Sequence, residues 1–223
     1  MFDNKARKEE RLRADEGTII STAQYNATIG GLTLYGLLMN AALASTATAF
    51  MQSVNPLVFL LIYFVCSIAG VMMSVKSTSP MVSFIGYNLV VVPIGLLLSL
   101  VIPFEDPSVV TAAILTTAAV TAIMVMLALM KPDIFDGMGR ALSIALIVGF
   151  IAELIAKLLG YGGDLFNWLF VLIFAGYIGY DLHVAQRYPK TLDNAIDSAL
   201  DMYLDIINLF MRLLQILGNS KRR

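Results

Sequence analysis

Long apolar stretches alternate with short polar breaks along the whole chain. Each stretch has about the 20 residues that a helix needs to cross the hydrocarbon layer of a membrane. The breaks at 76–80, 103–107 and 187–190 contain proline, which commonly ends a helix. The pattern therefore predicts an all-α bundle of seven helices with tight connections, at about 27–51, 56–75, 80–102, 109–130, 140–159, 165–187 and 195–217.

The composition indicates that this helical bundle is an integral membrane protein. Of the 223 residues, 58% are hydrophobic and only 14% are charged, so a water-soluble fold could not bury the apolar surface. We expect a charged N-terminal cytosolic tail at 1–25, a seven-helix membrane domain at 26–218 and a basic C-terminal tail at 219–223. The net charge of −1 argues against nucleic acid as a partner, and the lone Cys66 excludes a disulfide framework.

The distribution of Lys and Arg predicts the orientation. Cytoplasmic loops carry the excess of basic residues. A cytoplasmic N-terminus places most of them on one face and leaves Lys157 on the other, as expected for a multi-pass protein of the inner cell membrane. The basic residues 221–223 would lie outside if the last segment crossed fully. A re-entrant or centrally buried last segment would return them to the inside.

The last segment is the most polar of the seven. One helical face carries five polar residues spaced by four, four, three and four: Asp197, Asp201, Asp205, Asn208 and Arg212. Charges are costly among lipid tails and must pair, protonate or meet water. We therefore expect the other six helices to enclose this segment.

Asp181, near the end of the sixth segment, is the acidic residue that could meet this stripe. The short break near Pro189 makes segments six and seven antiparallel, which places Asp181 level with Asp201 and within about one 5.4 Å turn of Asp205. Spacing does not choose between these two partners. Paired carboxylates in a poorly hydrated site share a proton, and when deprotonated they suit calcium. The alternative is that these acids are solvated in the headgroup region.

Three groups of residues give the chain a resemblance to the Bax inhibitor-1 family over about residues 20–218. The resemblance implies a seven-helix fold with the last helix central, and a pH-sensitive leak of calcium or related cations without a cofactor. It also implies that Asp181 and Asp205 are a hydrogen-bonded pair, coupled to opening, that could contact calcium. The matching residues are Gly179-Tyr180-Asp181, the run 202–210 with 213–218, and Ser79-Pro80, Ser83-Phe84 and Tyr87-Asn88.

Lys76 is a candidate latch because of the same resemblance. In bacterial channel-like members of the family, an arginine near the end of the second segment can engage the acidic pair, and Lys76 is the comparable position. A lysine offers one compact ammonium in place of a bidentate fork, so such a latch would be looser. The alternative is an ordinary loop lysine on the cytoplasmic side.

Several other polar residues lie within apolar segments. Glu153 and Lys157 are spaced for a structural pair, while Glu153, Asp201 and Asn208 are also candidates for an ion path. His183, the only histidine, follows Asp181 by two residues and points elsewhere on a helix. We interpret it as interfacial, with tuning of a pH response as the alternative. The spacings Gly30-Gly31 and Gly176-x-x-Gly179 are typical of helix packing.

The function that the sequence favours is a cation leak, and two other classes compete with it. There is no phosphate loop, zinc-binding helix or Ser-x-x-Lys motif, so the sequence gives an enzyme no support. A regulatory partner of a membrane-bound protease is the first alternative, with the charged tail at 5–16 as its recognition element. A secondary transporter would also bury carboxylates, but the halves show no inverted repeat.

Overall fold

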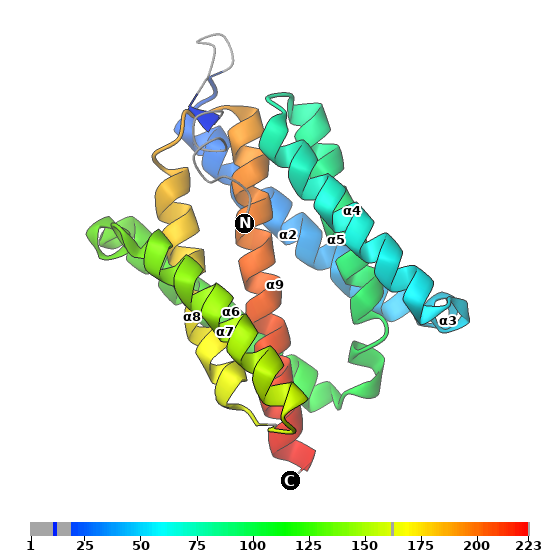
Figure 1. Cartoon of the computed structure of the whole chain (residues 1–223). Coiled ribbons are helices and arrows are strands. Elements are labelled where there is room, and N and C mark those ends of the chain that lie inside the picture. The colour runs from blue at the N-terminus through cyan, green and yellow to red at the C-terminus, as the bar shows by residue number, and fades with distance from the viewer. Residues whose placement is uncertain (1–10, 13–18, 162, 223) are drawn as a thin grey trace. The chain divides into compact units, whose positions relative to one another are not determined.

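The computed structural model describes residues 11–12, 19–161 and 163–222 (Figure 1). In these residues there are seven long helices, one short helix and two 3-10 turns. In chain order they are α2 (Thr22–Thr46), α3 (Thr48–Ser53), α4 (Pro56–Lys76), α5 (Pro80–Leu98), η2 (Ile102–Phe104), α6 (Pro107–Met130), η3 (Pro132–Phe135), α7 (Met138–Leu158), α8 (Leu165–Ala185) and α9 (Leu192–Arg222).

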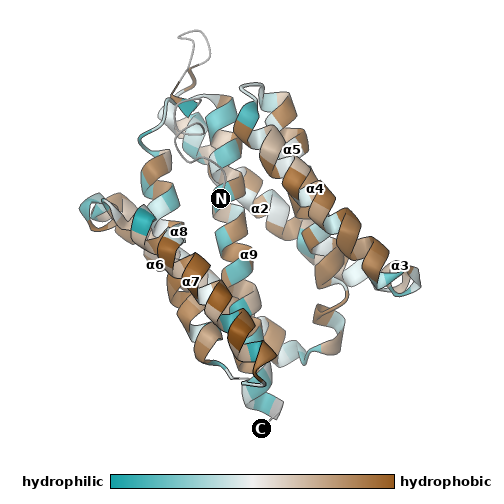
Figure 2. Ribbon diagram, in the orientation of Figure 1, coloured by the Kyte–Doolittle hydropathy of each residue, from teal (hydrophilic) through white to brown (hydrophobic). Residues whose placement is uncertain are grey.

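Six of the long helices, α2 and α4–α8, are long and apolar enough to cross a membrane. Their surfaces are rich in large apolar side chains, and Figure 2 shows α4, α5 and α6 as mostly hydrophobic. On α4, for example, Leu57, Leu61 and Val65 are each more than half exposed. These side chains would be unfavourable in water and are suited to lipid. The chain is therefore a multi-pass membrane protein.

The helix ends follow local capping chemistry. Ser21 and Gln24 form a capping box, so α2 begins at Thr22, about five residues before the apolar stretch predicted there. Asn55 and Asp106 cap α4 and α6, and each is followed by a proline at the first helical position. The first predicted segment is also divided, because the helical backbone is interrupted at Ala47 and resumes as α3.

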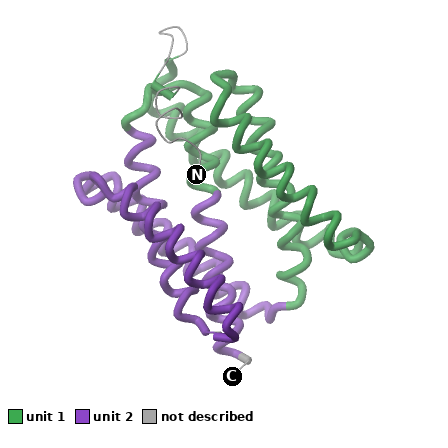
Figure 3. The backbone as a smooth tube through the Cα atoms, viewed as in Figure 1, with its two compact units in different colours: residues 1–104, 187–203 green, residues 105–186, 204–223 purple. Residues whose placement is uncertain are grey.

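The described chain divides into two compact units (Figure 3). The first contains residues 1–104 and 187–203, and so holds α2–α5 and the start of α9. Its core includes the fully buried rings of Tyr25, Tyr87 and Tyr203. Between α4 and α5, Gly70 and Gly86 let the two backbones touch, because a Cβ atom on either would lie 2.5 or 2.6 Å from the carbonyl oxygen of the other.

The second unit contains residues 105–186 and 204–223, and so holds α6–α8 and the rest of α9. Glycines on α8 allow close packing here, as the sequence predicts. A Cβ on Gly176 would meet Leu142, and one on Gly179 would overlap the ring of Phe135. Gly30 and Gly31 are different, since nothing lies within 4 Å of a Cβ on either. The packing interpretation is confirmed for the α8 glycines and wrong for the α2 pair.

Helix α9 is one continuous helix of 31 residues, about 46 Å long. It is in contact with all six membrane-crossing helices, and the predicted fold with the last helix enclosed by the other six is confirmed. The contacts are Tyr25 with Ser198 and Asn40 with Tyr203 from α2, Ser74 with Asp197 from α4, Ser83 with Asp193 from α5, Ser108 with Lys221 from α6, Glu153 with Arg212 from α7, and Asn167 with Arg212 from α8.

The two ends of α9 lie beside two different connections of the chain. The start of α9 lies beside the start of α2, where Ile19 and Thr191 form a bridge. Its end lies beside the connection between α5 and α6, where Lys221 Nζ is 2.6 Å from Asp106 Oδ2. Each of these two contacts lies within one compact unit, and α9 is not among the six described helices that could cross a membrane by length and composition.

The Lys221–Asp106 contact predicts a pH effect at the end of α9. Hydrogen bonds from Lys221 and Ser108 hold the pKa of Asp106 well below its usual range. The contact should therefore stabilise the fold fully above the ordinary aspartate pKa of about 4 and be lost as the pH falls through the lowered pKa. At neutral pH, we expect amide hydrogen exchange in the last turn of α9 to be faster in Asp106→Asn than in the native chain. In the native chain, the loss of protection at this turn should appear only in strong acid. Equal exchange in both chains at neutral pH would contradict this.

Candidate functional site

The two carboxylates that the resemblance singles out lie in the same unit. Asp181 is half-buried in the last turns of α8, and Asp205 is buried on α9. Both lie within electrostatic reach of the Tyr177 hydroxyl, which donates a hydrogen bond of 3.1 Å to Ser143 Oγ on α7. Tyr177 is one helical turn before Asp181, so the same face of α8 presents both residues. A hydroxyl and two acids thus gather among α7, α8 and α9.

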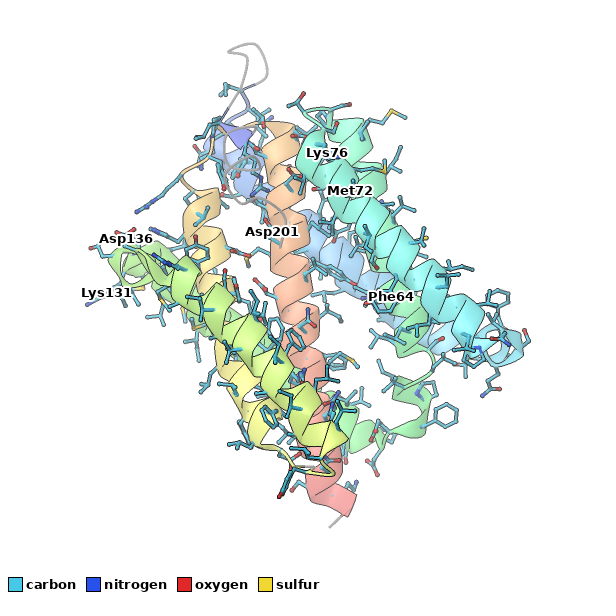
Figure 4. All side chains as sticks on the ribbon, viewed as in Figure 1. Phe64, Met72, Lys76, Lys131, Asp136 and Asp201 are labelled. Carbon is cyan, nitrogen blue, oxygen red and sulfur yellow. The ribbon has the colours of Figure 1, made fainter. Side chains whose placement is uncertain are left out.

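The first turns of α9 carry three more acids, all in the other unit, and each has a hydrogen-bond donor. Ser83 on α5 donates to Asp193 over 2.7 Å, and Ser74 on α4 donates to Asp197. Asp201, which projects from α9 in Figure 4, accepts from an arginine over 3.3 Å. We name Asp193, Asp197 and Asp201 the acidic face. Of the two partners that the spacing allowed for Asp181, Asp205 is the one that shares Tyr177 with it.

The arginine at the acidic face is Arg11, from the N-terminal tail. Its Nε lies 3.4 Å from Asp197 Oδ2 and its Nη1 lies 3.3 Å from Asp201 Oδ2. Its guanidinium also stacks on the ring of Tyr188, 4.7 Å from the centroid. The side chain is only 6% exposed. Sequence analysis missed this contact because the tail has no apolar periodicity, and because Arg11 and Asp197 are 186 positions apart.

Lys76, the candidate latch, is the last residue of α4. It is exposed in the last turn of α4 (Figure 4), and the residue at this end of α4 that bonds to α9 is Ser74. Asn208, another candidate, donates to the Leu204 carbonyl one turn earlier over 2.7 Å. That amide therefore satisfies the backbone of its own helix.

Glu153 is part of a charged cluster in the second unit that the sequence showed only in part. The predicted pair with Lys157 is present at 2.8 Å. In addition, both oxygens of Glu153 accept hydrogen bonds of 2.9 Å from Arg212 on α9, whose Nη1 also donates to Asn167 on α8. The Arg212 guanidinium lies 4.1 Å from the centroid of the Phe170 ring. This cluster ties α9 to α7 and α8.

His183 is buried, although it was expected at the membrane interface. Its Nε2 lies 3.1 Å from Asp136 Oδ1, in the connection between η3 and α7, and its ring lies against Phe135. Asp136 is about half exposed, so this connection reaches solvent. His183 therefore links the end of α8 to the α6–α7 connection.

The described residues offer a limited set of metal ligands. Within 11–12, 19–161 and 163–222 there is no group of three or more His, Cys, Asp or Glu side chains that could hold a metal ion. Calcium sites in proteins use six to eight oxygen ligands.

A bundle of membrane-crossing helices with a charged helix in contact with all of them defines a polytopic membrane protein with ionisable groups in its interior. The family described as "Inhibitor of apoptosis-promoting Bax1" matches residues 25–222. The chain therefore belongs to the Bax inhibitor-1 family, as the sequence motifs predict.

Several relatives support this assignment. An uncharacterized membrane protein of Streptococcus pyogenes serotype M3 is 32% identical over 134 residues, which cover 56% of this chain and 58% of the relative. Protein LIFEGUARD 4 of Arabidopsis thaliana is 40% identical over 111 residues, or 47% of this chain and 44% of the relative. Bax inhibitor 1 of Saccharomyces cerevisiae is 40% identical over 58 residues, or 25% of this chain and 18% of the relative. The matched part of the chain thus covers less than two thirds of the length of each of these relatives.

Proposed function

We propose that the protein is a pH-sensitive leak channel for calcium or related cations, gated by protonation of the Asp181–Asp205 pair. The observation that carries the proposal is that both carboxylates lie within electrostatic reach of one hydroxyl, Tyr177, inside a membrane bundle. Ionisable groups at such depth are costly and usually functional.

Two carboxylates that lie close together do not ionise independently. When they share a proton, the pair carries one negative charge and holds α8 to α9 by a hydrogen bond. When the proton leaves, the two like charges repel, and their oxygens become hard ligands for a cation. Proton loss would therefore both loosen the contact between α8 and α9 and attract the ion that passes.

Calcium entry into proteoliposomes from roughly pH 6 to pH 8 tests the gate. We expect the flux through the native chain to vary with pH, by at most about tenfold per pH unit for one shared proton. Asp181→Asn and Asp205→Asn should each flatten that dependence, because an amide does not titrate. Asp133→Asn, in the exposed α6–α7 connection, is the matched control and should keep the native profile.

Three outcomes have different meanings. A flat profile in both variants with a normal control supports the pair as the sensor. A native profile in both variants would remove the pair from the gate. If no variant passes calcium at any pH, the leak function is wrong and a partner function becomes the better proposal.

The orientation belongs to the same proposal. With the N-terminus in the cytoplasm, the acidic face at the start of α9 lies on the cytoplasmic side and Lys221 lies outside with Lys157. Most of the basic loop residues remain inside, as the positive-inside rule requires. The N-terminal tail would then be available to a cytoplasmic or membrane-bound protease, the alternative partner.

A further inference from the structure

We propose that the N-terminal tail is an intramolecular inhibitor, pinned through Arg11 to the acidic face of α9. The proposal rests on the leak function argued above, and it concerns a basic residue that lies outside the family match at 25–222. All of its contacts fall within the first compact unit.

The Arg11 side chain makes two kinds of contact, ion pairs with the acidic face and stacking on a tyrosine ring. The guanidinium forms ion pairs with two carboxylates that are one turn apart on α9, Asp197 at 3.4 Å and Asp201 at 3.3 Å. Its flat face stacks on Tyr188, in the connection that leads into α9. A planar guanidinium suits this combination, whereas a lysine ammonium has neither the planar fork nor the flat face that stacks on a ring.

The backbone of the tail is held as well. The Asn194 side-chain amide donates hydrogen bonds to the Arg11 carbonyl over 2.9 Å and to the Pro189 carbonyl over 3.0 Å. Asn194 is 3% exposed. Since one buried amide joins the tail to the α8–α9 connection, the tail is bound in a defined conformation at this point.

Two of the three acids have hydrogen-bond donors other than Arg11. Ser74 from α4 and Ser83 from α5 donate to Asp197 and Asp193, so these carboxylates are fixed by neighbouring helices. Burying an arginine is unfavourable unless it is paired and hydrogen-bonded. The 6% exposure of the Arg11 side chain is therefore consistent with specific binding and not with a solvated guanidinium.

The contact of Arg11 lies one helical turn from Asp205, a residue of the proposed gate. Asp201 is four residues, or one turn, before Asp205 on the same continuous helix. A cation that approaches Asp205 from the start of α9 first meets the acidic face. While Arg11 is bound there, its charge offsets part of the negative charge of these acids and so weakens their attraction for the cation. Release of the tail would expose them and raise the local cation concentration.

The test measures tail release and flux separately, in the full-length chain. A spin label at residue 12, introduced as Leu12→Cys in a Cys66→Ala background, reports the motion of the tail beside Arg11; Leu12 is about half exposed, so the label needs no buried space. We expect the label to move faster in Arg11→Gln and in Asp201→Asn. Arg11→Lys should give intermediate motion. Arg140→Gln removes the same charge from an exposed position on α7 and should change nothing.

Initial calcium flux into proteoliposomes, measured on the same variants, should rise roughly tenfold in Arg11→Gln, the effect of one charge-assisted hydrogen bond on a two-state equilibrium. Lys76→Gln should leave both label motion and flux unchanged. If Lys76→Gln changes them and Arg11→Gln does not, Arg11 is not the inhibitory residue. Equal label motion in the native chain and in Arg11→Gln would overturn the pinning. Faster motion without a change in flux would overturn the inhibition. If the native chain and every variant pass no calcium, the leak function fails and takes the inhibitory role with it, while the label still decides the pinning.

Discussion

Replacing Glu153 with alanine is expected to lower the free energy of unfolding by about 3–5 kcal/mol. Glu153 is 7% exposed, and both of its oxygens accept hydrogen bonds from Arg212. The substitution would leave the Arg212 guanidinium inside the bundle without its carboxylate partner, although its Nη1 would still donate to the Asn167 side-chain oxygen. An uncompensated buried charge is far more costly than a lost surface pair. Denaturation in detergent, followed by circular dichroism, measures the loss.

Two matched variants separate this effect from simple loss of contacts. Lys157 also pairs with Glu153 but is 68% exposed, so Lys157→Gln should change the stability by less than about 0.5 kcal/mol. Removing both charges together, as Glu153→Gln with Arg212→Met, should cost less than Glu153→Gln alone, because no buried charge remains unpaired. Equal losses for Glu153→Ala and Lys157→Gln would show that Arg212 is not dependent on Glu153.

The fold could be predicted from the sequence because the membrane makes the signal strong. Seven apolar stretches and their proline breaks are enough to place the helices, and the stripe from Asp197 to Arg212 is enough to place α9 inside. The helix ends were less accurate. The capping box at Ser21 and Gln24 lies before the apolar stretch begins, so hydrophobicity alone starts α2 too late.

The site could be predicted only in part, because spacing along a helix shows which residues share a face but not which partner reaches them. The polar stripe singles out Asp205, and the position of Glu153 within an apolar stretch singles out that residue. Arg212 was assigned to the polar stripe without its partner Glu153, which is 59 positions away. Arg11 was missed entirely, since a charged tail is ordinarily solvated. Lys76 is exposed at the end of α4, and its role as a latch stays a prediction that rests on a family feature.

Glycine-to-alanine substitutions at the contact between α4 and α5 should destabilise the first unit by about 1–3 kcal/mol, the usual cost of overpacking. A Cβ on Gly70 would lie 2.5 Å from the Gly86 carbonyl oxygen, and one on Gly86 would lie 2.6 Å from that of Gly70. These obstacles are backbone atoms, so the two helices would have to separate. Gly31→Ala is the matched control, because nothing lies within 4 Å of its Cβ. It should be neutral or stabilise α2 by up to about 1 kcal/mol.

Substitution of Gly70 or Gly86 should also weaken the hydrogen bonds that hold the acidic face. Ser74 is one turn after Gly70, and Ser83 is close to one turn before Gly86; these serines donate to Asp197 and Asp193. Separation of α4 from α5 would weaken both hydrogen bonds and loosen the acids that hold Arg11. We therefore expect Gly86→Ala to combine lower stability with faster motion of a label at residue 12, whereas Gly31→Ala should leave that motion native. Destabilisation without any change at the label would mean that the acidic face does not depend on the contact between α4 and α5.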